Sequence, residues 1–75
     1  MQIAYFSDGS FVIHRAMETP VLRASAWFDK TGKMINGETI SRNTNRTYNV
    51  RPNSATWKAL QTIGARVHDT RHVIR

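Results

Sequence analysis

The chain has 75 residues, no cysteine and a formal net charge of +6, so there is room for one domain whose small core no disulfide reinforces. Hydrophobic residues make up 40% of the sequence, which excludes a disordered tail and suits a folded protein. No stretch has the pattern of a signal peptide or of a membrane-spanning helix. We therefore expect one compact domain over residues 1–75, located in the cytoplasm and away from membranes.

The first predicted element is a β-hairpin over residues 2–15. Asp8-Gly9 is typical of a two-residue turn and lies between runs rich in aromatic and β-branched residues. Such a turn pairs Phe6 with Phe11 on one face of the hairpin. The register then places four residues together on the opposite face: Ile3, Tyr5, Val12 and His14.

A second hairpin is predicted from residue 21 to residue 40. Its first strand alternates two sets of side chains, and the apolar set is expected in the core. That set is Leu22, Ala24, Ala26 and Phe28, and the other is Val21, Arg23, Ser25 and Trp27. Asp29 to Gly32 suit a type I turn closed by a glycine in the left-handed conformation. Gly37 within the return strand indicates a bulge or a close backbone approach.

The polar segment from residue 41 to residue 49 suits either a loop or a third hairpin that ends in a short strand near residues 47–50. A helix start signal follows at Pro52 to Ser54, and Trp57, Leu60 and Ile63 form one apolar stripe. Gly64 has the position of a C-terminal cap, so we predict a helix near residues 54–63 and an extended tail. The predicted fold is α+β, an antiparallel sheet of four to five strands with this helix packed on it.

The charge is unevenly distributed along the chain. Residues 1–41 carry equal numbers of acidic and basic side chains, whereas residues 42–75 hold seven cations, six of them arginine, against Asp69 alone. Arginine pairs bidentately with phosphate or carboxylate and stacks on bases. An anionic partner is therefore predicted, the alternative being a solvated face with no partner. The candidate contacts are Arg42, Arg46, Arg51, Arg66, Arg71 and Arg75, with Tyr48 and Trp27 as aromatic anchors.

Histidines carry the only candidate for catalysis. A small toxin-like ribonuclease can use one histidine as general base with an arginine to hold the phosphate, and the chain offers His14, His68 and His72. Their spacing is not diagnostic. His68 and His72 are four residues apart, as metal ligands can be on a helix, but two ligands do not make a site. We therefore expect no enzyme activity, metal, cofactor or small-molecule substrate.

These observations favour a binding protein, acting as a monomer or a homodimer. The leading hypothesis is an inhibitor or regulator of the phage or mobile-element type, similar to anti-CRISPR proteins, whose arginine-rich face engages nucleic acid or the nucleic-acid-binding groove of a nucleoprotein machine. The first alternative is a regulator that binds DNA or RNA directly, and an adaptor that docks on an acidic protein surface uses the same residues. The ribonuclease is the second alternative.

Overall fold

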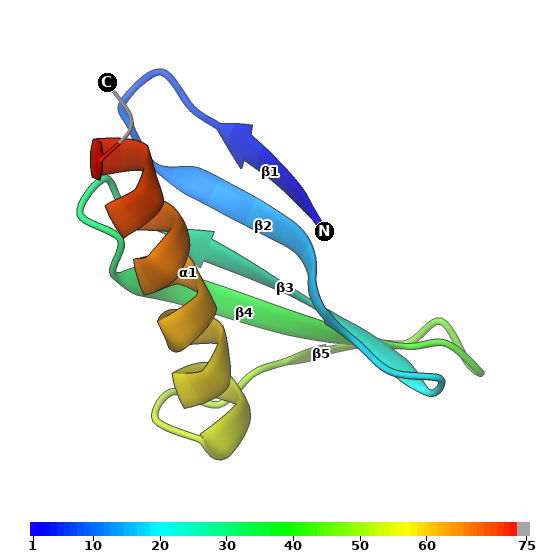
Figure 1. Ribbon diagram of the computed structural model, residues 1–75. Coiled ribbons are helices and arrows are strands. Elements are labelled where there is room, and N and C mark those ends of the chain that lie inside the picture. Colours follow the sequence, from blue (N-terminus) through cyan, green and yellow to red (C-terminus); the bar gives the residue numbers. More distant parts are fainter. Residues whose placement is uncertain (74–75) are drawn as a thin grey trace.

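The computed structural model describes residues 1–73 and has the predicted α+β architecture (Figure 1). Its elements are β1 (Gln2–Tyr5), β2 (Phe11–Glu18), β3 (Leu22–Phe28), β4 (Met34–Ser41), β5 (Thr47–Asn49) and α1 (Ala55–Val73). The strands form one antiparallel sheet in chain order, from β1 at one edge to β5 at the other. The polar segment after β4 is thus a hairpin, and the sheet has five strands. Helix α1 lies across one face of the sheet.

The core lies between α1 and the three central strands. Phe11 and Phe28 stack with their ring centroids 4.9 Å apart, and Leu60 of α1 is fully buried against the same cluster. Ala24, Ala26 and Phe28 of the apolar set of β3 are buried in this core, and the small alanines leave room for the helix to approach, whereas Leu22 is only half-buried. Trp57 is partly buried and packs against this core, as expected from the apolar stripe that it forms with Leu60 and Ile63.

The first hairpin is shifted by one residue from the predicted register. Tyr5 pairs with Phe11 and Ile3 pairs with Ile13, so the prediction that Phe6 faces Phe11 is wrong. The connection is longer than two residues, because the Phe6 N–H donates to the Ser10 carbonyl and closes a loop over residues 6–10. As a result the side chains of β1 that face the helix are Ile3 and Tyr5.

The helix extends well beyond its predicted end near residue 63. It begins after Ser54, whose Oγ accepts a hydrogen bond of 3.2 Å from the N–H of Trp57, as an N-cap does. Gly64 lies inside the helix and is buried. The helix packs so closely on β3 here that a Cβ at Gly64 would lie 2.0 Å from Cε2 of Phe28. The glycine therefore marks close packing and does not mark a helix end. The predicted extended tail is wrong as far as Val73.

Two irregularities bend the sheet. The register shifts between Ile13 and Met17 of β2, where Arg15 has a φ of 54°, and it shifts again opposite Trp27 and Phe28. Gly37 marks the close approach predicted for it, since a Cβ there would lie 3.2 Å from Cβ of Val50. A bulge bends its strand and redirects side chains, so the part of β2 after Ile13 can turn away from the helix.

Candidate anion-binding arm

Two hairpin ends project past the helix on the same side of the molecule (Figure 1). One is the end of the β2–β3 hairpin and the other is the end of the β4–β5 hairpin. We call residues 15–23 and 40–48 together the arm. Leu22 pairs with Ser41 and Arg23 pairs with Ile40, so the two ends are neighbours in one sheet. The arm gives the molecule its elongated shape, which measures 41 × 23 × 19 Å.

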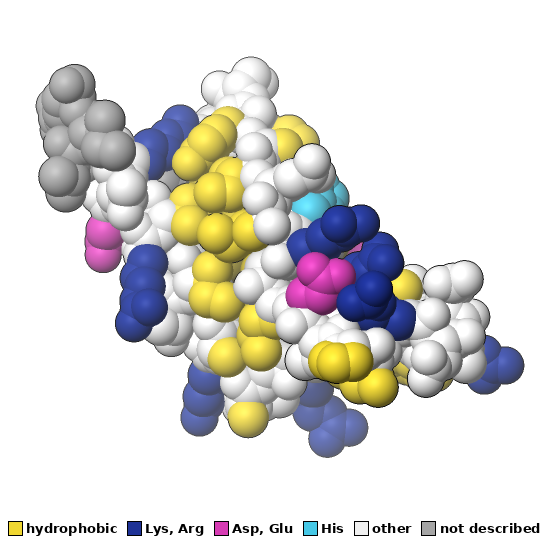
Figure 2. Space-filling model, turned by 45° about the vertical axis from the view of Figure 1, so that its right-hand side comes forward, with side chains coloured by type: hydrophobic (Ala, Val, Ile, Leu, Met, Phe, Trp, Pro, Cys, Tyr) yellow, Lys and Arg dark blue, Asp and Glu magenta, His cyan; other side chains and the backbone are white. Residues whose placement is uncertain are grey.

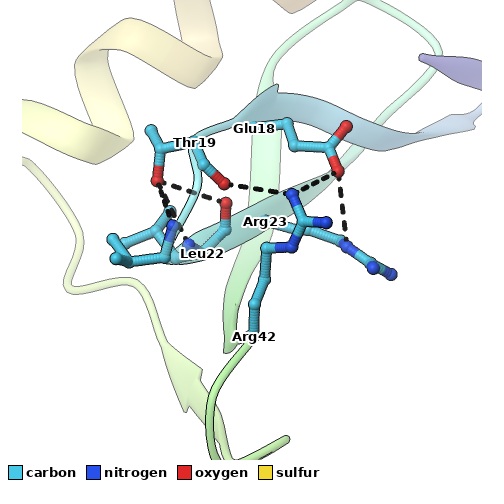
Figure 3. A network of polar contacts seen from close by, with 6 residues as sticks. Glu18, Thr19, Leu22, Arg23 and Arg42 are labelled. Carbon is cyan, nitrogen blue, oxygen red and sulfur yellow. Dashed lines mark hydrogen bonds and ion pairs between the residues drawn. The ribbon is translucent and has the colours of Figure 1, made fainter.

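Arg42 ties the two hairpin ends together (Figure 3). Its guanidinium Nη1 lies 3.3 Å from Oε2 of Glu18 and donates to the carbonyl of Thr19 at 3.3 Å. Its backbone N–H donates to the carbonyl of Val21 at 2.9 Å. Thr19 in turn holds the β2–β3 turn, because its N–H donates to the carbonyl of Leu22 at 2.8 Å. Arg42 is therefore partly structural, because it holds the two hairpin ends of the arm together.

The arm carries a strong positive charge. It holds four arginines, Arg15, Arg23, Arg42 and Arg46, against Glu18 alone, which makes a net +3 of the total +6. Figure 2 shows lysine and arginine side chains gathered around an acidic side chain on the sheet. Arg42 and Arg23 share the Glu18 carboxylate. Nε of Arg23 lies 3.4 Å from the same Oε2 as an ion pair, but without hydrogen-bond geometry. Within residues 1–73, Arg15 and Arg46 pair with no acidic side chain.

The tip of the β4–β5 hairpin is polar and exposed. Asn45 adopts a φ of 59° and donates its N–H to the carbonyl of Ser41 at 2.8 Å, while the Arg46 N–H donates to Oγ1 of Thr44 at 3.3 Å. Tyr48 follows on β5 and is 54% exposed. The tip thus presents a cation, amide and hydroxyl groups and an aromatic ring to solvent.

The structure distributes the predicted contact residues over several places. Arg42, Arg46 and Tyr48 lie on the arm. Arg51 is exposed in the loop before α1. The others lie on the helix, on the opposite face or beyond the described part of the chain: Arg66 and Arg71 on α1 at the end away from the arm, Trp27 on the helix-free face of β3, and Arg75 outside the described residues.

Trp27 has the orientation predicted for it. It pairs with Val12 and Asn36 on the face that the helix does not cover, and it is half-buried. His14 meets it edge to face, with ring centroids 6.4 Å apart. Val12 is only 3% exposed although no helix covers that face. Trp27 and His14 thus form a small aromatic pair on the face of β3 that also carries Arg23 of the arm.

Sequence reasoning missed two arginines of the arm. Arg15 and Arg23 belong to the half of the chain whose charges sum to zero, so the net charge of that half concealed them. Glu18 pairs with Arg23 across the β2–β3 turn, but the predicted first hairpin ended at residue 15, so no predicted strand placed these two residues opposite each other. The bulge at Arg15 had no sequence signal either.

Two acidic side chains outside the arm serve turns. Oδ1 of Asp8 accepts hydrogen bonds from the hydroxyl and the N–H of Ser10 at 2.6 and 2.9 Å, and these bonds lower the pKa of Asp8. Oδ1 of Asp29 accepts from the hydroxyl of Thr31 at 2.6 Å and from the N–H of Lys33 at 3.0 Å, which lowers the pKa of Asp29. Both turns lie at the end of the sheet away from the arm.

The described histidines lie on different faces of the sheet. His14 lies beside Trp27 on the open face, whereas His68 is on α1 against Gly32. The side chain of His72 lies outside the described part. Within that part, no three side chains of the metal-binding types come together. The helix α1 is also too polar to cross a membrane, and the described residues include no other helix.

Comparison with known proteins gives no relative to guide the assignment. No family model, no curated protein and no solved structure matches the chain. The class of the protein therefore rests on its own geometry, which is a helix-backed antiparallel sheet with a projecting basic arm.

Proposed function

We propose that the protein is a non-enzymatic binding protein whose arm engages nucleic acid, either free or held in a nucleoprotein complex. The observation that carries this proposal is the arm itself, which places four arginines against one glutamate on two joined hairpin ends. An inhibitor or regulator of the phage or mobile-element type, including an anti-CRISPR-like one, acts through the same contact when the nucleic acid belongs to a host machine.

The shape of the arm supports this partner. The major groove of B-DNA is about 12 Å wide and admits a two-stranded β-ribbon, which suits the β4–β5 hairpin end of the arm but not both joined hairpin ends at once. The arginines supply phosphate contacts, and the exposed Tyr48 supplies a ring on which an unpaired base can stack. Because Arg42 already joins the two ends, little conformational entropy is lost on binding.

Charge also discriminates between possible partners. A groove that binds nucleic acid is itself positive, so an empty groove repels an arm of charge +3. Bound nucleic acid or an acidic protein surface attracts it. This argues for the nucleic acid as the direct contact, with an acidic protein surface as the competing docking partner.

The test is binding of fluorescein-labelled 20-mers, single-stranded and duplex DNA and RNA, followed by anisotropy at low salt. We expect Arg15→Glu combined with Arg46→Glu to weaken binding by at least about tenfold. The matched control is Lys30→Glu combined with Lys33→Glu, which changes the net charge equally in the turn at the far end of the sheet. Equal losses in the two double variants, or no binding by the wild type, would exclude the arm as the nucleic-acid contact.

A further inference from the structure

The helix leaves the outer part of its own sheet face uncovered. Ile3 and Tyr5 of β1 face the helix side but remain 38% and 47% exposed. Beside them runs an open groove of about 470 Å³, between β1 and the second half of α1. Figure 2 shows a hydrophobic band along the helix with basic side chains beside it. The groove is lined by Ile3, Tyr5, Arg66, Val67, Thr70 and Arg71.

Strand β1 is also an edge strand with free backbone groups. Hydrogen bonding alternates along an antiparallel pair, and the Phe6 N–H bonds to the Ser10 carbonyl in the pair with β2. Every second residue back from Phe6 therefore also directs its backbone N–H and C=O at β2, and these residues are Ala4 and Gln2. The N–H and C=O groups of Ile3 and Tyr5 therefore point outward, so the same two residues offer both groove floor and hydrogen-bonding edge.

Charge defines what fits this groove. Arg66 is exposed and pairs with no acidic side chain among the described residues. Arg71 lies 4.2 Å from the centre of the Tyr5 ring and donates to the carbonyl of Gly9 at 3.1 Å. Asp69, the acidic residue of the helix, is three residues from Arg66 and does not line the groove. An apolar floor beside two arginines is complementary to a ligand that is both apolar and acidic.

We propose that β1 and the groove bind an extended acidic peptide by strand addition. The peptide backbone pairs with the outward groups of Ile3 and Tyr5, as in other cases of β-augmentation. An apolar side chain lies on the groove floor, and carboxylates two residues to either side pair with Arg66 and Arg71. A second copy of the chain fits poorly, because pairing of two β1 edges brings the arginines of both copies together.

The probe is a fluorescein-labelled heptapeptide, Thr-Glu-Thr-Ile-Thr-Glu-Thr, whose alternate residues face one side of a strand. We expect binding that Arg66→Glu weakens by at least about fivefold, while Lys58→Glu on the same helix changes it by less than about twofold. A peptide with lysine in place of glutamate, and one with two adjacent prolines, should not bind. Amide shifts should change at Ile3, Tyr5 and Val67.

Several results would overturn this proposal. They are an equal loss in Arg66→Glu and Lys58→Glu, absence of binding by the wild type, and amide shifts confined to the arm. A concentration-dependent dimer that Ile3→Arg abolishes would assign the edge to a second copy. The arm variant Arg46→Glu should bind the peptide with unchanged affinity, because Arg46 does not line the groove. Failure of peptide binding and failure of nucleic-acid binding are therefore distinguishable. Circular dichroism of each variant verifies that it is folded.

Discussion

At Gly64 a single missing methyl group decides how closely the helix packs. Replacing glycine by alanine within a helix ordinarily stabilises it by about 1 kcal/mol. Here the new Cβ would lie 2.0 Å from Cε2 and 2.4 Å from Cζ of the buried Phe28 ring. We predict that Gly64→Ala instead lowers the free energy of unfolding by about 1–3 kcal/mol, measured by urea denaturation. Thr62→Ala, on the exposed face of the helix, is the control, and a stabilised Gly64→Ala would contradict the packing described.

Hydrogen bonds to Asp29 make a second prediction at this scale. The hydroxyl of Thr31 is the largest cause of its lowered pKa, followed by the N–H of Lys33. Since the folded pKa lies below the unfolded one, the stabilisation is present above about pH 4 and is lost as the pH falls through the folded pKa. Thr31→Val should raise the pKa of Asp29, measured by carboxyl NMR titration, and leave Asp8 lowered in the same spectrum. An unchanged Asp29 would show that the Thr31 bond is not formed in solution.

Among the elements, the two hairpin ends of the arm are joined by the side chain of Arg42 in addition to their backbone pairing. Arg42→Met removes the bonds to Glu18 and Thr19 but keeps the backbone pairing with Val21. Because the ion pair is exposed, we predict a loss of less than about 1 kcal/mol in global stability. Amide hydrogen exchange near residues 19–22 and 42–46 should nevertheless become faster, while exchange in β1 stays the same. Unchanged exchange in the arm would mean that Arg42 does not order it.

The strands and their turns show what the sequence can predict. The alternation in β3 identified its core face, and the Asp29 turn was predicted correctly. The first turn has the same construction, since Gly9 and Gly32 each donate at 3.0 Å to the carbonyl three residues earlier, with φ values of 94° and 87°. Asp8-Gly9 suits both a two-residue turn and this longer one. Local sequence did not separate them, and the register of β1 depends on that choice.

The helix end was not predictable from local signals either. Gly64 is compatible with a cap and with a packing contact, and the second role requires knowledge of where Phe28 lies. Val67 continues the apolar stripe of Trp57, Leu60 and Ile63 and packs on the core, so periodicity was the better guide. A contact between distant segments decided the structure at this position.

For the whole molecule, the position of the cations along the chain does not show which of them share a surface. The sequence places the excess in residues 42–75, whereas folding brings Arg23 and Arg42 to the same Glu18 carboxylate and leaves Arg66 and Arg71 at the opposite end. Linear position conceals such grouping because cross-strand neighbours are far apart in sequence. The arm and the groove are therefore different surfaces, for which we predict different ligands.

The most direct test of the arm is the salt dependence of nucleic-acid binding. If all four arginines contact phosphates, a plot of log affinity against log salt for duplex DNA should have a slope of about −3.6, and Arg15→Gln with Arg46→Gln should reduce it to about −1.8. Lys30→Gln with Lys33→Gln should leave the slope unchanged. A slope near zero, or one that changes equally in both double variants, would contradict the proposal that the arm binds the phosphate backbone.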